Sequence, residues 1–127
     1  MRTLVSTLQM EREEWLKWRN MGIGGSDASV IAGVNPYRSV LQLWKEKTGQ
    51  EVPEEKDTEV THFGNILEPV VKKEFTRRTG LKIRNRYAIL QSEEYPFMLA
   101  DLDGIIYEDK KLCVFEAKTA SAYKKDS

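Results

Sequence analysis

Three residues near the end of the chain have the types and the spacing that metal-dependent hydrolysis needs. Asp103 opens one predicted strand, and Glu116 and Lys118 lie in the next predicted strand along the chain. Side chains alternate between the two faces of a strand, so Glu116 and Lys118 project from the same side. Antiparallel pairing through the turn at residues 108–111 can bring the carboxylate of Asp103 next to that of Glu116.

Two carboxylates held this close repel each other unless a proton or a cation lies between them. Their hard oxygen atoms suit Mg²⁺ or Mn²⁺, and Lys118 can then orient a metal-bound water or stabilise charge on a phosphate. The alternative is an ordinary ion pair between Glu116 and Lys118 on an exposed strand. Apolar neighbours such as Val114 and Phe115 favour the functional interpretation, because a charged side chain in a core strand usually has a partner or a task.

A third carboxylate, Glu68, lies within the apolar stripe of a long predicted helix over residues 61–79. It precedes Pro69, which marks either the first turn of a helix or a kink within one. Two interpretations are open. Glu68 caps backbone groups near Pro69, or it stands as a third carboxylate beside the metal site.

A glycine-rich segment over residues 22–25 leads into Ser26 and Asp27 at the start of another predicted helix. The free N–H groups of a helix start, together with a hydroxyl, form a site for an anion, and Arg19 can add a bidentate contact to a phosphate. No strand–helix dinucleotide motif or P-loop lysine accompanies the segment. The alternative is therefore a tight turn followed by an N-cap.

The charges of the chain are balanced in sum but uneven in distribution. The 127 residues include 20 basic and 20 acidic side chains, which gives a formal net charge of zero. Residues 72–86 nevertheless hold seven bases and a single acid, Glu74. The seven bases are Lys72, Lys73, Arg77, Arg78, Lys82, Arg84 and Arg86. Such a stripe can follow a DNA backbone without regard to sequence, but it is also typical of a solvated helix face and an exposed strand.

The composition excludes several classes of protein. No apolar run approaches the ~20 residues that a membrane span needs, and the N-terminus has no apolar signal segment. The single cysteine excludes an internal disulfide and a cysteine-based zinc site. We therefore expect a cytoplasmic protein with no membrane partner.

The elements that position these residues follow from periodicity and turn signals. Helices are predicted over residues 11–20, from Ser26 or Asp27 onward, over 40–48 and over 61–79. After Gly80, short segments rich in Ile, Val, Tyr and Phe predict largely antiparallel strands. These strands cover residues 81–91, 97–99, 104–107 and 112–118. Helices followed by a sheet indicate an α+β or α/β fold, in a chain whose length suits one domain.

Five ordered motifs carry a resemblance to a known family. They are W-x-x-W-R-x-x-G-I-G-G-S-D-A-S, N-P-Y-R-S-x-x-x-L-W-x-x-K-T-G, G-N-I-L-E-P-V-V, F-M-L-A-D-L-D-G and F-E-A-K-T-A. Together they cover nearly all of residues 11–125, and in this order they resemble the YqaJ-type viral recombinases. These are phage lambda exonuclease-like members of the PD-(D/E)xK nuclease superfamily. The resemblance implies a restriction-endonuclease-like core, with a short mixed sheet flanked by helices.

The resemblance also implies an activity and partners. The expected activity is that of a 5′→3′ exonuclease on double-stranded DNA, dependent on Mg²⁺ or Mn²⁺. The expected partner is a phage single-strand annealing protein. The protein is expected to act in the cytoplasm of a bacterial host or to be encoded by a prophage. Relatives form ring-shaped homotrimers. They also continue past the last motif with further helices, so residues 1–127 are expected to be a single nuclease-like domain without its C-terminal helices.

The same resemblance assigns roles to individual residues. Asp103 and Glu116 look like the metal-binding carboxylates, with the carbonyl of Ala117 as a further ligand. Lys118 looks like the residue that positions the attacking water, and Glu68 looks like the helix-borne acid near the metal. Asp101 does not align with the motif aspartate, which is Asp103.

A second set of residues is expected to contact DNA. Arg19 and Ser26 look like the pocket for a 5′ phosphate or the strand backbone, with Asp27 nearby as helper or cap. The basic stripe, including Lys72, Arg77 and Arg84, would follow the backbone.

Two other functions stay open at this point. One is a non-catalytic module that uses a nuclease-like surface to bind DNA or a protein. The other is a structure-specific endonuclease, which shares the metal site and differs in its substrate.

Overall fold

The computed structural model describes residues 1–51 and 59–120 of the chain, which fold into a mixed α+β structure. Two compact units are distinguished by their internal contacts. The first consists of Met1–Glu54 with Tyr87–Asp101, and the second of Glu55–Arg86 with Leu102–Ser127. Each unit contains one three-stranded antiparallel sheet. The α+β class expected from the sequence is confirmed, and the arrangement is consistent with a restriction-endonuclease-like core.

The sheet of the first unit has the strand order β1-β3-β4. These strands are β1 (Arg2–Ser6), β3 (Ala88–Gln91) and β4 (Leu99–Asp101). The central strand carries most of the core, because Ala88, Ile89 and Leu90 are all buried.

The helices of the first unit are short and are fixed by local hydrogen bonds. They are α1 (Arg12–Arg19), a 3₁₀ helix η1 (Gly25–Asp27), α2 (Ala28–Ile31) and α3 (Val40–Lys47). The hydroxyl of Ser39 accepts the N–H of Gln42 at 3.1 Å and so caps α3. Val30 and Leu43 are the buried apolar residues of α2 and α3.

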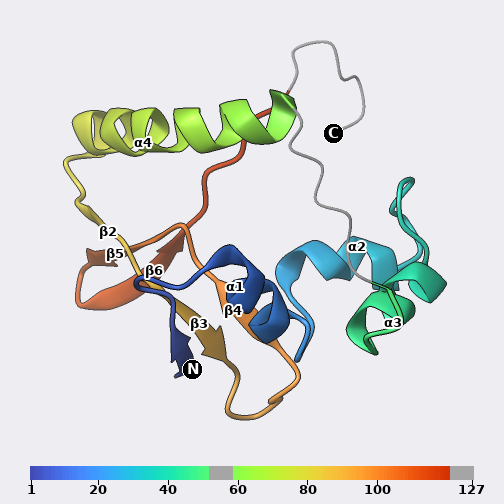
Figure 1. Ribbon diagram of the computed structural model, residues 1–127. Helices are drawn as coiled ribbons and strands as arrows, with labels where there is room; N and C mark the ends of the chain where they lie inside the picture. The colour runs from blue at the N-terminus through green and yellow to red at the C-terminus, as the bar shows by residue number, and fades with distance from the viewer. Residues whose placement is uncertain (52–58, 121–127) are drawn as a thin grey trace. The chain divides into compact units, whose positions relative to one another are not determined.

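The second unit consists of one long helix and the sheet β2-β5-β6 (Figure 1). The helix is α4 (Glu59–Thr79), and the strands are β2 (Ile83–Arg84), β5 (Gly104–Glu108) and β6 (Lys111–Phe115). Phe75 of α4 packs edge-on against Phe115 of β6, with ring centroids 5.2 Å apart. This contact anchors the helix to the sheet.

Pro69 lies inside α4 rather than at its first turn. Because proline has no N–H, the carbonyl of Asn65, four residues earlier, lacks its usual helical donor. Of the two positions that the sequence left open for Pro69, the structure selects the one within the helix.

Three strand predictions need correction. The run over residues 81–91 is divided between β2 and β3, which belong to different sheets, and β1 was not predicted at all. The single short mixed sheet is replaced by two antiparallel sheets and one isolated parallel bridge between Ile23 and Met98. The alternation of apolar and polar residues within one segment indicates that the segment is extended, but it does not indicate which distant strand it pairs with.

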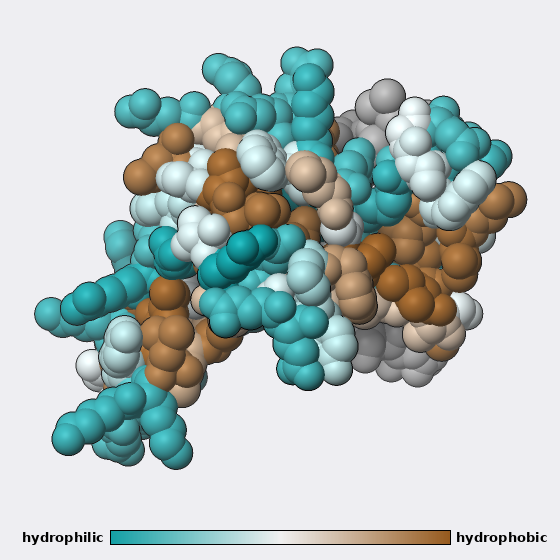
Figure 2. All heavy atoms as spheres, turned by 90° about the horizontal axis from the view of Figure 1, so that it is seen from below, coloured by the Kyte–Doolittle hydropathy of each residue, from teal (hydrophilic) through white to brown (hydrophobic). Residues whose placement is uncertain are grey.

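The last predicted strand, over residues 112–118, ends earlier and is more exposed than expected. β6 ends at Phe115, which is its only buried residue, whereas Leu112 and Val114 are at least half exposed. β6 lies at the edge of the sheet, with β5 as its neighbour. Figure 2 shows that apolar side chains, in brown, occur at the surface among polar ones, in teal.

No helix in the described part of the chain is both long and apolar enough to cross a membrane.

Gly22 is needed where the chain leaves α1 and runs beside β4. The N–H of Ile23 donates to the carbonyl of Phe97 at 2.7 Å, and the N–H of Leu99 donates to the carbonyl of Ile23 at 2.9 Å. A Cβ on Gly22 would lie 2.6 Å from both Leu99 Cγ and the Phe97 carbonyl oxygen. Such a distance requires the backbone to move.

We therefore expect Gly22→Ala to lower the free energy of unfolding by about 1–3 kcal/mol, the usual cost of overpacking. Gly25→Ala is the matched control, because a Cβ there meets nothing within 4 Å. Urea denaturation of both variants measures the difference. Equal stabilities would show that the contact at Gly22 is not close.

Candidate functional site

The β5–β6 hairpin brings Asp103 and Glu116 together. Gly104 is paired with Phe115 in the antiparallel register, so the residues just outside this pair face each other. The carboxylate of Asp103 also accepts the N–H of Ala117 at 2.8 Å. This hydrogen bond ties the residue before β5 to the segment after β6.

The two carboxyl groups are close enough to change how one of them titrates. Partial burial raises the pKa of Glu116 above its ordinary value, and the neighbouring charge of Asp103 raises the pKa further. Lys118 opposes this shift, since its Nζ lies 3.8 Å from Glu116 Oε2. The expected same-side placement of Glu116 and Lys118 is therefore present, although both residues lie beyond the end of β6.

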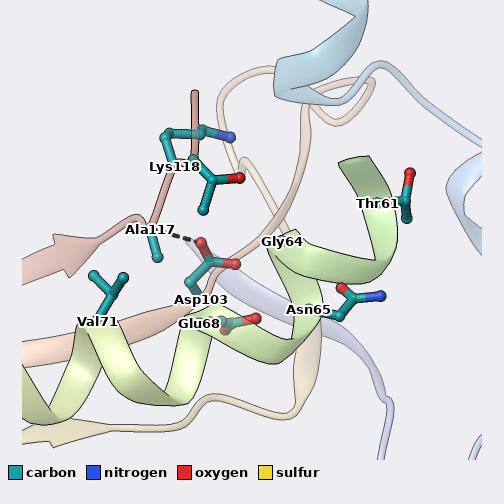
Figure 3. Close-up of a pocket in the computed structure, with 9 residues that line it drawn as sticks. Thr61, Gly64, Asn65, Glu68, Val71, Asp103, Ala117 and Lys118 are labelled. Atoms are coloured by element: carbon teal, nitrogen blue, oxygen red, sulfur yellow. Dashed lines mark hydrogen bonds between the residues drawn. The ribbon is translucent and has the colours of Figure 1, made fainter. Parts of the chain in front are cut away.

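A pocket of about 260 Å³ opens beside these groups (Figure 3). One wall is α4, and the other is formed by Asp103 and the segment that follows β6. The lining residues are Thr61, Gly64, Asn65, Glu68, Val71, Asp103, Ala117, Lys118 and Thr119. Three of the residues predicted to act in catalysis thus share one pocket, and Glu116 adjoins it through Asp103.

Glu68 already has a cationic partner in this pocket. Its Oε1 lies 3.0 Å from Nζ of Lys72, one helical turn further along α4. The same ammonium donates to Oδ1 of Asn85 at 3.0 Å. Lys72, predicted to contact DNA, is thus placed as the counter-charge of a site carboxylate.

The donor chemistry of Asp103 and Glu116 fits a divalent cation. In residues 1–51 and 59–120 no group of three His, Cys, Asp or Glu side chains is arranged to hold a metal ion. Mg²⁺, however, is usually held by only one or two carboxylates and keeps several waters. Two adjacent carboxyl groups, one with a raised pKa, are a pair whose repulsion a cation would relieve.

The residues predicted to hold a phosphate lie in the first unit. Nη2 of Arg19 donates to the hydroxyl of Ser26 at 3.0 Å, so the predicted pair is brought together. Asp27 is buried, and its Oδ2 accepts the N–H of Gly24 at 2.9 Å. The structure therefore places Asp27 as a cap of the turn, not facing an incoming anion.

Sequence reasoning missed a network of buried charges around Asp27. Lys47 Nζ lies 3.3 Å from Asp27 Oδ2, and Arg38 forms ion pairs with Asp27 at 3.6 Å and with buried Glu46. Lys47 also donates to the carbonyl of Arg19 at 2.9 Å. The available signal was the helical spacing that placed Lys47 with Val40 and Leu43 on one side of α3.

Some side chains of the basic stripe already form ion pairs within the protein, which the sequence did not indicate. Nε of Arg77 and Nε of Arg78 lie 3.0 and 2.9 Å from the carboxylate of Glu74. The pKa of Glu74 is lowered, chiefly by the hydrogen bond from Arg77, and the pKa of Arg77 is raised by the same bond. Arg84 is exposed on β2.

A second pocket, of about 380 Å³, lies further along α4. It is lined by Pro69, Lys72, Lys73, Thr76, Ile83 and Asn85. Its polar side chains supply hydrogen-bond donors and two positive charges but no carboxylate, which suits an anion.

Two comparisons with known proteins show what the chain is similar to. The model of the YqaJ-like viral recombinase domain family matches residues 14–126. The Bacillus subtilis (strain 168) protein named "Uncharacterized protein YqaJ" is 46% identical over 120 residues. The alignment covers 94% of this chain and 37% of that relative, so the chain spans little more than a third of the relative's length.

The raised pKa of Glu116 has a consequence for stability. A carboxyl group whose pKa is higher in the folded protein stabilises the fold below its unfolded pKa, and this contribution is lost as the pH rises through the folded pKa. Glu116→Gln removes the charge and should therefore increase stability at neutral pH. The increase should vanish at acidic pH, where Glu116 is protonated in both states.

Thermal unfolding across this pH range measures the effect, and Glu108→Gln is the control. Glu108 ends β5 on the same hairpin, and its side chain is exposed. A pH-independent difference between Glu116→Gln and the unmodified chain would contradict the interpretation.

Proposed function

The chain belongs to the YqaJ-like viral recombinase domain family, and from this membership we propose that it acts as a metal-dependent nuclease of phage recombination. The reaction proposed is hydrolysis of phosphodiester bonds in DNA. One observation carries the proposal: the neighbouring carboxyl groups of Asp103 and Glu116, with the ammonium of Lys118 3.8 Å from Glu116. All three residues lie within the matched part of the chain.

We propose a 5′→3′ exonuclease that acts on double-stranded DNA. Support comes from Arg19 and Ser26, whose side chains already contact each other and could receive a terminal phosphate. The proposed partners are duplex DNA and a phage single-strand annealing protein, with a homotrimer as the proposed assembly. Its proposed place of action is the cytoplasm of a bacterial host.

In the proposed mechanism Asp103 and Glu116 hold a Mg²⁺ or Mn²⁺ ion, with the backbone of Ala117 beside them. When bound, such an ion supplies an activated water and neutralises charge on the phosphate. Lys118 has the freedom to reach the reacting group, because its side chain is 84% exposed and its ammonium lies 3.8 Å from Glu116. Its task would be to orient the water and to stabilise the phosphate oxygens.

Glu68 has a supporting task in this proposal. Its ion pair with Lys72, at 3.0 Å, holds its carboxylate at the pocket wall. It can then accept a hydrogen bond from a water in the pocket, which would fix the orientation of that water.

The first test is a nuclease assay on 5′-phosphorylated linear duplex DNA with Mg²⁺ or Mn²⁺. We expect release of nucleotides that EDTA abolishes. Glu116→Gln and Lys118→Ala should each reduce the rate by about 100-fold or more, the usual loss when a catalytic acid, base or charge is removed. Lys111→Ala and Glu108→Gln are matched controls, because both lie on the same hairpin outside the pocket.

The outcomes separate the proposed function from its alternatives. Cleavage inside a circular or branched substrate, without release from ends, would favour a structure-specific endonuclease. Binding of Mn²⁺ without any cleavage would favour a non-catalytic module. A chain that neither binds Mn²⁺ nor cuts DNA would refute the metal site itself.

The second test concerns the backbone-binding part of the proposal. Lys73 lines the second pocket, whereas Arg78 is held by Glu74. Each phosphate contact contributes about −0.9 to the slope of log K against log salt concentration. Lys73→Ala should therefore make this slope for duplex DNA less steep by about 1, and Arg78→Ala should change it less.

The slope is measured by fluorescence anisotropy in EDTA, so that cleavage does not interfere. Equal changes for Lys73→Ala and Arg78→Ala would indicate a diffuse attraction by net charge instead of a local contact at this pocket.

A further inference from the structure

We propose that Trp15 and Asp101 are positioning residues that hold Arg19 ready to receive the terminal phosphate of a DNA strand. The inference rests on the proposed function, which assigns that phosphate to Arg19 and Ser26. It adds two residues that do not themselves contact the phosphate.

The guanidinium of Arg19 is held on two sides. Its Nη2 donates to Ser26 Oγ at 3.0 Å, and its Cζ lies 5.0 Å from the centre of the Trp15 ring. Trp15 and Arg19 are four residues apart on α1, so they are neighbours on one helix face. A planar guanidinium against an aromatic ring has fewer conformations to lose when it binds an anion.

Trp15 is in turn fixed by the sheet. Its indole N–H donates to Oδ2 of Asp101 at 2.8 Å, and Asp101 is the last residue of β4. Arg12 also approaches the ring, with its Cζ 4.8 Å from the ring centre. Asp101, which does not align with the motif aspartate, thus has a hydrogen-bond partner and a task in the first unit.

Two further constraints act on Arg19 itself. Its carbonyl accepts a hydrogen bond from Lys47 at 2.9 Å, which fixes the end of α1. Gly24 leaves room for the guanidinium, because a Cβ there would lie 3.0 Å from Arg19 Nη2. The position of Arg19 is therefore set before any ligand arrives.

The chemistry of this arrangement suits a terminal phosphate. Within the described residues, Nη2 is the only nitrogen of the Arg19 guanidinium with a hydrogen-bond acceptor. The remaining N–H groups and the Ser26 hydroxyl can bind a group with several oxygens and nearly two negative charges. A terminal phosphate monoester has that charge at neutral pH, whereas an internal phosphodiester carries one negative charge.

The experiment compares binding of two duplexes that differ only in a 5′-phosphate or a 5′-hydroxyl end. Binding is measured by fluorescence anisotropy in EDTA, so that it does not depend on metal or cleavage. The unmodified chain should prefer the phosphorylated end. Asp101→Ala and Trp15→Phe should each reduce this preference by about two- to tenfold, which corresponds to the loss of one hydrogen bond.

Two variants distinguish positioning from a general effect on the fold. Asp101→Asn keeps an oxygen that can accept the indole N–H, so it should retain the preference. Trp18→Phe is the matched control on the same helix, because the indole of Trp18 donates to Glu14 at 3.5 Å, whereas the ring against which the Arg19 guanidinium lies is that of Trp15. Neither should change the ratio of the two affinities.

The inference is overturned if Asp101→Ala and Trp15→Phe keep the full preference, or if Trp18→Phe reduces it equally. It is also overturned if the unmodified chain does not distinguish the two ends. That last result would not contradict the proposed nuclease activity, because the activity assay tests the roles of Asp103, Glu116 and Lys118. Conversely, an inactive chain that still prefers the phosphorylated end would support the inference alone.

Discussion

The second unit depends on the repulsion between two carboxyl groups that the β5–β6 hairpin forces together. The pairing of Gly104 with Phe115 places Asp103 opposite Glu116, so the backbone brings the two side chains to the same end of the hairpin. Neighbouring groups partly compensate the negative charge of the two carboxylates, since the N–H of Ala117 donates to Asp103 and the ammonium of Lys118 lies near Glu116. Packing of Phe75 on Phe115 then fixes the helix that forms the other wall of the pocket. Two neighbouring carboxyl groups that repel each other lower the stability of the fold, and such groups are typical of functional sites.

The first unit contains two buried carboxylates, and each is paired with a cation that is itself partly exposed. Asp27 is only 2% exposed and Glu46 only 7%, yet each is paired with Arg38, and Asp27 also with Lys47. Such pairs give little net stability, but the loss of one member leaves an uncompensated buried charge that costs about 3–5 kcal/mol. The network therefore fixes the geometry of the turn around Asp27 more than it strengthens the fold.

How much the sequence predicted depended on how local each interaction is. The four helical segments were predictable because caps such as Ser39 and the apolar spacing act within a few residues. The meeting of Asp103 and Glu116 was predictable because a hairpin sets its own register. Strand β1 and the division of residues 81–91 depend on pairing between distant segments, as does the network around Arg38. The segment that contains Val114 was expected to be a core strand, but β6 is an edge strand and Val114 is half exposed, because an apolar run does not reveal where its strand lies in the sheet.

Pro69 gives α4 a dynamic property as well as a structural one. Because Pro69 has no N–H, the helix lacks one backbone hydrogen bond, to the carbonyl of Asn65, at the turn that carries Glu68. Local opening begins where backbone hydrogen bonds are fewest, so the turns before Pro69 can loosen while Phe75 stays packed on Phe115. The wall of the pocket that α4 forms can therefore open locally at a free-energy cost well below that of unfolding the unit. Backbone amide protons before Pro69 would then exchange with solvent faster than those after it.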